Sequence, residues 1–147
     1  MSPSPSTPSI ATGTTRTRAA EATIDTGRIA RLCVLAILIP GLGHYLVGQT
    51  RKAAIFFVVL MTMFAIGLAF GGRLLPFTTD EPLVFLGAAA QWVLLLPRVL
   101  AGLAGLGAGD VVAVTYEYGN TFLIVAGLLN ALVTLDVYDI ATGRKAT

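Results

Sequence analysis

Four long apolar segments dominate the pattern of hydrophobic and polar positions along the chain. They cover residues 29–47, 53–71, 83–103 and 118–140, and short polar or glycine-rich linkers separate them. A helix needs about 20 residues to cross the hydrocarbon layer of a bilayer. Unbroken runs such as residues 53–70 lack the alternation of membrane β-strands. The sequence therefore predicts an all-α integral membrane bundle of four transmembrane helices.

The first part of the chain has a different composition. Residues 1–27 are rich in Ser, Thr and Pro and carry few long apolar side chains. Such a segment cannot bury a core, so we expect residues 1–27 to form a disordered tail before a four-helix transmembrane domain at residues 28–147. Its Ser, Thr and Arg content is also compatible with an organelle transit peptide, which remains an alternative.

Composition supports the membrane class and excludes several others. The chain is 55% hydrophobic and only 12% charged, with a mean hydropathy of +0.80. These values are not those of a water-soluble surface. The basic residues are scattered and the formal charge is only +2, so no nucleic-acid partner is expected. The single cysteine, Cys33, excludes an internal disulfide and a cysteine-based zinc site.

The basic residues predict the orientation in the membrane, because they concentrate on the cytoplasmic side. With four spans, the N-terminal segment, the second linker and the C-terminal tail share one side. That side would hold seven of the ten basic residues, namely Arg16, Arg18, Arg28, Arg31, Arg73, Arg144 and Lys145. We therefore expect a multi-pass protein of the cell's inner membrane with both termini in the cytoplasm.

Arg51 and Lys52 argue against this orientation, since four spans place them on the outer side. A break of the first segment at Pro40 and Gly41 would explain them, because the chain would then re-enter on the side from which it came. Only residues 29–39 would precede this break, which is too short to span. The re-entrant first segment therefore stays open as an alternative.

The stretch Pro40-Gly41-Leu42-Gly43-His44-Tyr45 has a glycine and aromatic pattern before a basic turn. It is similar to the signature of the small bacterial domain family named for its two transmembrane helices, although it lacks the Arg that usually precedes the aromatic residue. The whole chain resembles an uncharacterised family of small bacterial multi-span membrane proteins, in part through residues 117–122 and 135–140. Neither resemblance implies an enzymatic activity.

A few polar residues inside the apolar segments are the candidates for function. His44 is the only histidine, so we expect it to bond a carbonyl freed by Pro40 or an acid across the bundle. Gln91 and Arg98 share one helix face, and Arg98 should reach the interface or pair with Glu117 or Asp110. A proton-carrying or ligand-contacting role for His44 and an anion site at Arg98 are the alternatives.

The last segment adds further candidates. Asn130 lies near its middle, where an amide needs a partner, and Gln91 at similar depth is the expected one. Asp136 and Asp139 end the helix, where we expect an ion-pair cluster with the nearby cations Arg28, Arg31, Arg144 and Lys145. Glu117 precedes the helix start and suits a cap or a dipole partner. A second charge cluster is expected at the opposite rim; it would join Arg98, Arg51, Lys52, Asp110, Glu117 and His44.

These observations predict a non-catalytic membrane protein that acts as a structural, assembly or accessory subunit. No catalytic residue, cofactor or metal site is expected. The partners would be the lipid bilayer and either another membrane protein or further copies of this chain. The alternative is a small transporter or ion-conducting oligomer that uses Asn130, Gln91, Arg98 and His44.

Overall fold

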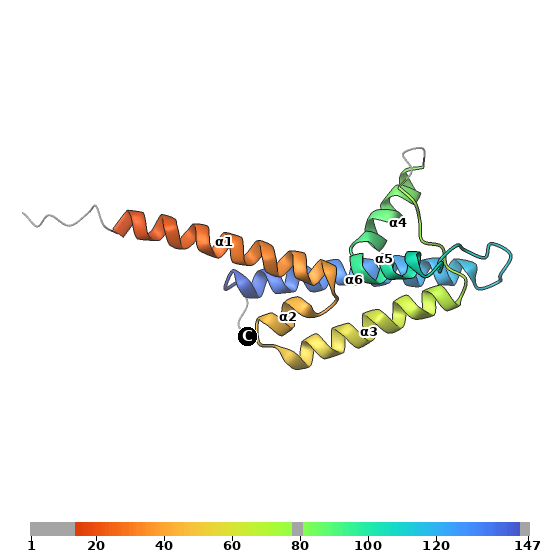
Figure 1. Cartoon of the computed structure of the whole chain (residues 1–147), viewed down its shortest axis with the longest axis horizontal. Helices are drawn as coiled ribbons and strands as arrows, with labels where there is room; N and C mark the ends of the chain where they lie inside the picture. The colour runs from red at the N-terminus through yellow and green to blue at the C-terminus, as the bar shows by residue number, and fades with distance from the viewer. Residues whose placement is uncertain (1–13, 78–80, 145–147) are drawn as a thin grey trace, which may run out of the picture.

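The computed structural model describes residues 14–77 and 81–144, with side chains from residue 26 onward. Its elements are helices (Figure 1): α1 (Thr14–Leu38), α2 (Leu42–Leu46), α3 (Thr50–Ala69), α4 (Pro82–Trp92), α5 (Leu95–Leu103) and α6 (Tyr116–Ala141). One isolated bridge, between Arg73 and Ala108, is the sole β-type pairing within these ranges. The all-α class is therefore confirmed.

Helix α6 is the element around which the others pack. It contacts α1, α3 and α4, and α3 runs antiparallel beside it along most of its length (Figure 1). We name the two ends of the molecule after α6: the loop end, where α6 begins, and the C-terminal end, where it ends. The chain reaches the loop end through α3 and returns through α6.

Glycines allow α6 to lie close to its neighbours. A Cβ on Gly67 of α3 would meet Leu123 at 2.8 Å, and one on Gly127 would lie 1.9 Å from the Ala90 carbonyl oxygen of α4. Real Cβ atoms do not approach so closely, so only glycine permits these two crossings. Beside them a small core forms from Phe64, Leu94, Ala101, Leu123 and Ala126.

The first apolar segment does not form a single helix over residues 29–47. Helix α1 ends at Leu38, and the chain turns back at Pro40 and Gly41 into the short helix α2. Gly41 has φ = +79°, and a Cβ there would lie 2.5 Å from the Ala53 carbonyl oxygen, so the turn requires glycine. The chain turns back toward the C-terminal end of the molecule, with the break that the alternative interpretation of Arg51 and Lys52 supposed.

The third apolar segment, predicted at residues 83–103, is also broken. Helices α4 and α5 meet at an angle of 101°. Pro97 has no N–H and cannot bond the Val93 carbonyl, so the helical ladder is interrupted where the two helices join. Four full spans are consequently not confirmed.

Two helices of the described residues are long and apolar enough to cross a membrane. They are α3 and α6, and a third span results only if the bent pair of α4 and α5 is taken as one. The second and fourth predicted segments, residues 53–71 and 118–140, match α3 and α6 within a few residues.

Helix α1 begins earlier than the expected domain boundary at residue 28. Residues 14–27 belong to this helix, whereas residues 1–13 of the expected tail lie outside the described part of the chain. Residues 16–22 contain only Arg, Thr, Ala and Glu, and most of these are good helix formers. Their favourable backbone preference extends the helix beyond the apolar segment.

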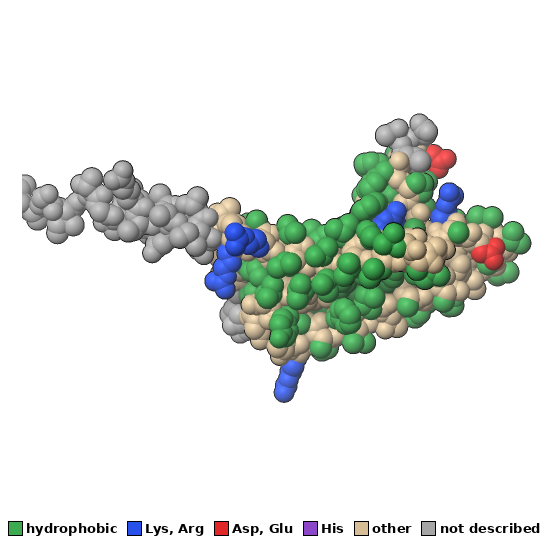
Figure 2. Space-filling view, viewed as in Figure 1, with side chains coloured by type: hydrophobic (Ala, Val, Ile, Leu, Met, Phe, Trp, Pro, Cys, Tyr) green, Lys and Arg blue, Asp and Glu red, His purple; other side chains and the backbone are tan. Residues whose placement is uncertain are grey.

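The helix break at Pro40 changes the distribution of charge. The turn with Arg51 and Lys52 now lies at the C-terminal end, together with Arg28, Arg31 and Arg144. On the face drawn in Figure 2, blue side chains lie at this end and others lie in the half toward the loop end. Among the cations whose side chains are described, only Arg73 and Arg98 lie in the half toward the loop end. The basic residues therefore segregate more clearly than four spans would allow.

We expect Thr50 and Thr142 to face the same side of the membrane and Leu106 to face the other. Single cysteines at these positions, in a Cys33→Ser background, should therefore give two matching labelling patterns and one opposite pattern with an impermeant thiol reagent. The four-span arrangement predicts instead that Thr50→Cys and Leu106→Cys label alike. That result would contradict the re-entrant first segment.

Candidate functional site

Asn130, in the middle of α6, is fully buried between the two helix breaks. Its side-chain Nδ2 donates to the Ala36 carbonyl at 3.2 Å and to the Val93 carbonyl at 2.8 Å. The hydroxyl of Thr134 donates to the Asn130 backbone carbonyl at 2.8 Å. One amide group thus joins α1, α6 and the end of α4.

The two acceptors of Asn130 are the carbonyls that the prolines leave without a helical donor. In a continuous helix, residue 40 would donate to Ala36 and residue 97 would donate to Val93. Both positions are proline and have no N–H. The backbone N–H groups next to the prolines are used elsewhere, since Ile39 bonds the Leu35 carbonyl and Arg98 bonds the Leu94 carbonyl, both at 3.0 Å. The two hydrogens of one amide therefore replace the two missing backbone donors.

Gln91, near the end of α4, makes a second polar junction and is fully buried. Its Oε1 accepts from the Leu75 N–H at 2.9 Å, and its Nε2 donates to the Arg73 carbonyl at 3.0 Å. Leu75 and Arg73 belong to the non-helical chain between α3 and α4, where no helical ladder satisfies the backbone groups. The Gln91 side-chain amide therefore bonds this segment as a neighbouring β-strand would, with one acceptor and one donor.

Arg98 of α5 joins the same junction and is only 8% exposed. Its guanidinium donates to the Gln91 Oε1 and to the Leu75 carbonyl, and its Cζ lies 4.9 Å from the Trp92 ring centroid. The described residues give it no carboxylate partner, so the expected pairing with Glu117 or Asp110 is not found. Neutral oxygens and an aromatic face surround this cation instead.

The expected hydrogen bond between Gln91 and Asn130 is also absent from the described structure. Each amide is occupied by backbone groups at its own helix break. The prediction was wrong because it counted only side chains at equal depth. It ignored the carbonyls and N–H groups that prolines and non-helical segments leave open inside a membrane protein.

His44 of α2 forms the third junction. It is fully buried, and its Nε2 lies 2.8 Å from the Asp136 Oδ2 of α6. The Phe56 ring of α3 packs edge-on against the imidazole, with centroids 4.9 Å apart. Of the two partners expected for His44, the structure has the acid across the bundle and not a carbonyl freed by Pro40. The His44 Nδ1 is buried and has no hydrogen-bond partner within the described region.

The expected charge clusters are found only in part. Asp139 lies 4.0 Å from Arg144, as expected, but no ion pair of Arg28 or Arg31 with an acid is formed among the described side chains. The opposite cluster is divided, because His44 and the turn with Arg51 and Lys52 are at the C-terminal end while α5 and Glu117 are toward the loop end. Glu117 lies in the first turn of α6 and makes no side-chain cap, so it fits the dipole role alone.

The polar atoms of these junctions are arranged to hold helices together. The side chains of Asn130, Gln91 and Arg98 donate hydrogen bonds to backbone carbonyl or side-chain amide oxygens of the fold. The described His, Cys, Asp and Glu residues form no group of three that could hold a metal ion. Only a few buried side-chain atoms of the described residues lack a hydrogen-bond partner, and they include the Oδ1 of Asn130 and the Nδ1 of His44.

Two participants were not found by sequence reasoning. Asn120 accepts from the Arg73 N–H through its Oδ1 at 2.7 Å, and Phe56 packs against His44. The role of Asn130 did have a signal, because each proline inside an apolar segment leaves a carbonyl open four residues before it. No comparable signal identifies Asn120 or Phe56, since their roles depend on how the helices cross.

Comparisons with known proteins agree with the expectation of an uncharacterised family. The model of a family of unknown function (DUF6677) matches residues 31–146, which include all of the helices except the first part of α1. No curated protein and no solved structure matches the chain. Nothing in these comparisons supports the similarity of residues 40–45 to the two-transmembrane-helix domain family.

We expect Gln91→Met to lower the free energy of unfolding by roughly 2 kcal/mol or more, because Arg73, Leu75 and the buried Arg98 each lose a hydrogen bond. Gln49→Met is the matched control: the Gln49 Oε1 is already without a partner in the described structure, so this change should cost less than about 1 kcal/mol. Reversible unfolding in mixed detergent micelles, followed by circular dichroism, measures both. Equal losses would show that Gln91 does not hold the segment before α4.

Proposed function

We propose a function for this chain, which belongs to the DUF6677 family, from the use that it makes of its buried polar groups. We infer that it is a non-catalytic membrane protein that serves as a structural, assembly or accessory subunit. The observation that carries this proposal is that Asn130, Gln91 and Arg98 are engaged with carbonyl and amide groups of the fold. A catalytic or conducting site needs polar groups that are free to meet a substrate or ion.

The exposed apolar surface supports a role in assembly. Leu128, Leu132 and Leu135 of α6 are all half exposed or more, and their spacing places them on one helix face. Helix α3 exposes Ile55 and Val58 to a similar degree. In a membrane these faces meet lipid or another protein, so the fold offers contact surfaces along both of its long helices.

The proposed location is a bacterial inner membrane with both termini in the cytoplasm. Five described cations lie at the C-terminal end, and the cytoplasmic side of membrane proteins is the more basic one. If only α3 and α6 cross the membrane, the pair of α1 and α2 and the pair of α4 and α5 would each enter it partway, from opposite sides. The chain would then be multi-pass with two complete spans.

One observation favours the second candidate, a small transporter or ion-conducting oligomer. Arg98 is buried, and the described part of the structure gives it no carboxylate partner. Buried cations inside membrane proteins often mark a pathway for anions or protons. This candidate requires that the Arg98 guanidinium leave the Gln91 oxygen and meet a permeating anion.

The two candidates are tested by purifying the full chain in mild detergent from its own membranes. We expect a second membrane protein in a constant ratio, lost when the α6 face is changed by Leu132→Gln and retained when Leu83→Gln changes an exposed leucine of α4. We also expect proteoliposomes of the purified chain to pass no chloride or protons. A lone homo-oligomer whose chloride flux disappears in Arg98→Gln would overturn the accessory role and establish the transporter.

A further inference from the structure

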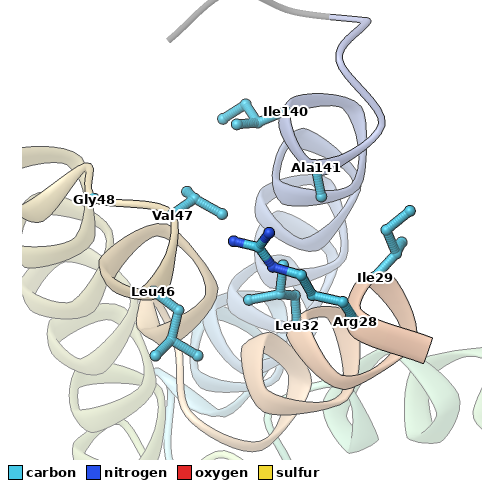
Figure 3. Close-up of a pocket in the computed structure, with 8 residues that line it drawn as sticks. All are labelled: Arg28, Ile29, Leu32, Leu46, Val47, Gly48, Ile140 and Ala141. Atoms are coloured by element: carbon cyan, nitrogen blue, oxygen red, sulfur yellow. The ribbon is translucent and has the colours of Figure 1, made fainter. Parts of the chain in front are cut away.

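We propose that a cavity at the C-terminal end of the molecule binds the phosphate headgroup of an anionic phospholipid. The cavity has a volume of about 490 Å³ and lies between α1, the end of α2 and the last turn of α6. In Figure 3 the guanidinium of Arg28 points into it, among the side chains of Leu32, Val47 and Ile140. This inference does not depend on the proposed accessory function.

Among the described side chains, no acid neutralises the charge inside the cavity. Arg28 is the only titratable side chain in the lining, and it forms no ion pair with the described acids. The two acids near this end face other groups, because Asp136 bonds His44 and Asp139 faces Arg144. A guanidinium presents a planar fork of N–H donors that fits phosphate oxygens. The cavity therefore offers a cation with open donors to a phosphate.

Most carbonyls in the last turn of α6 are already hydrogen-bonded. Those of Tyr138, Asp139 and Ile140 accept from the N–H groups of residues 142–144. Gly143, with φ = +72°, makes this closing turn possible. Arg28 can also act as a cation beside the negative end of the α6 dipole, and a lipid titration separates that structural role from ligand binding.

The surroundings select a lipid over a soluble anion. The rest of the lining is apolar apart from backbone, and it includes the exposed side chain of Leu46. The cavity lies at the end of a helix that can cross a membrane, where the headgroup phosphates of one leaflet are found. Arg31, Arg51 and Arg144 at the same end attract an anionic leaflet. Headgroup and acyl chain thus each find a matching surface.

The test is the thermal unfolding of the purified full chain in a zwitterionic detergent, with added phosphatidylglycerol or phosphatidylcholine. We expect phosphatidylglycerol to raise Tm by several degrees and phosphatidylcholine to have little effect. Arg28→Gln should weaken the response to phosphatidylglycerol about tenfold in lipid concentration, because a charged hydrogen bond is lost. The matched control Arg51→Gln removes a cation from the same end but not from the cavity, so its response should stay near that of the wild type.

A third variant and a soluble anion test whether the cavity itself holds the lipid. Ala141→Phe keeps Arg28 but fills the cavity, so it should weaken the response as Arg28→Gln does. Inorganic phosphate should produce no shift, and an equal shift would identify a site for soluble anions and overturn the lipid. An Arg28→Gln protein that unfolds earlier without lipid, yet responds to phosphatidylglycerol as fully as the wild type, would show that Arg28 serves only the helix dipole.

Discussion

The side-chain amide of Asn130 supplies the two hydrogen bonds on which the rest of the structure depends. Two apolar segments are interrupted by proline, and each proline leaves one carbonyl without a donor in the interior. Lipid offers no donors, so a broken helix can persist inside a membrane only where protein groups replace the missing bonds. Because both carbonyls meet the same amide, the two breaks are held against the middle of α6 at one point.

The other polar junctions follow the same constraint. Gln91 and Arg98 serve the open backbone of the segment before α4, and the pair of His44 and Asp136 fixes α2 against α6. Each buried polar side chain thus compensates for a place where the chain departs from a continuous span. The result is a fold in which two long helices can cross the membrane while the remaining helices turn back within the molecule.

Sequence patterns identified the parts of the fold that are governed by local rules. The helices α3 and α6 were predicted because their apolar runs are long and contain no proline. The first and third segments were predicted as full spans because hydrophobicity alone cannot tell a span from a hairpin of equal length. Pro40 with Gly41 gave the correct alternative for the first segment, and Pro97 was the equivalent signal in the third.

The candidate site was predicted less well than the helices. The residues proposed from sequence, including Asn130, Gln91 and His44, are indeed buried and polar. Their partners could not be derived, because most are backbone groups whose positions depend on how the helices cross. The acid that meets His44 is 92 residues away in the sequence, and only the antiparallel return of α6 brings it there.

The central claim is that Asn130 replaces the donors which the prolines lack, and a double-mutant cycle measures this directly. Asn130→Leu alone should lower the free energy of unfolding by about 1 to 3 kcal/mol. In a Pro97→Ala background a continuous helix can form across residues 93–97, and its residue 97 N–H can then bond the Val93 carbonyl, so the same change should cost about 1 kcal/mol less. Equal costs in the two backgrounds, measured by reversible unfolding in detergent, would contradict the account.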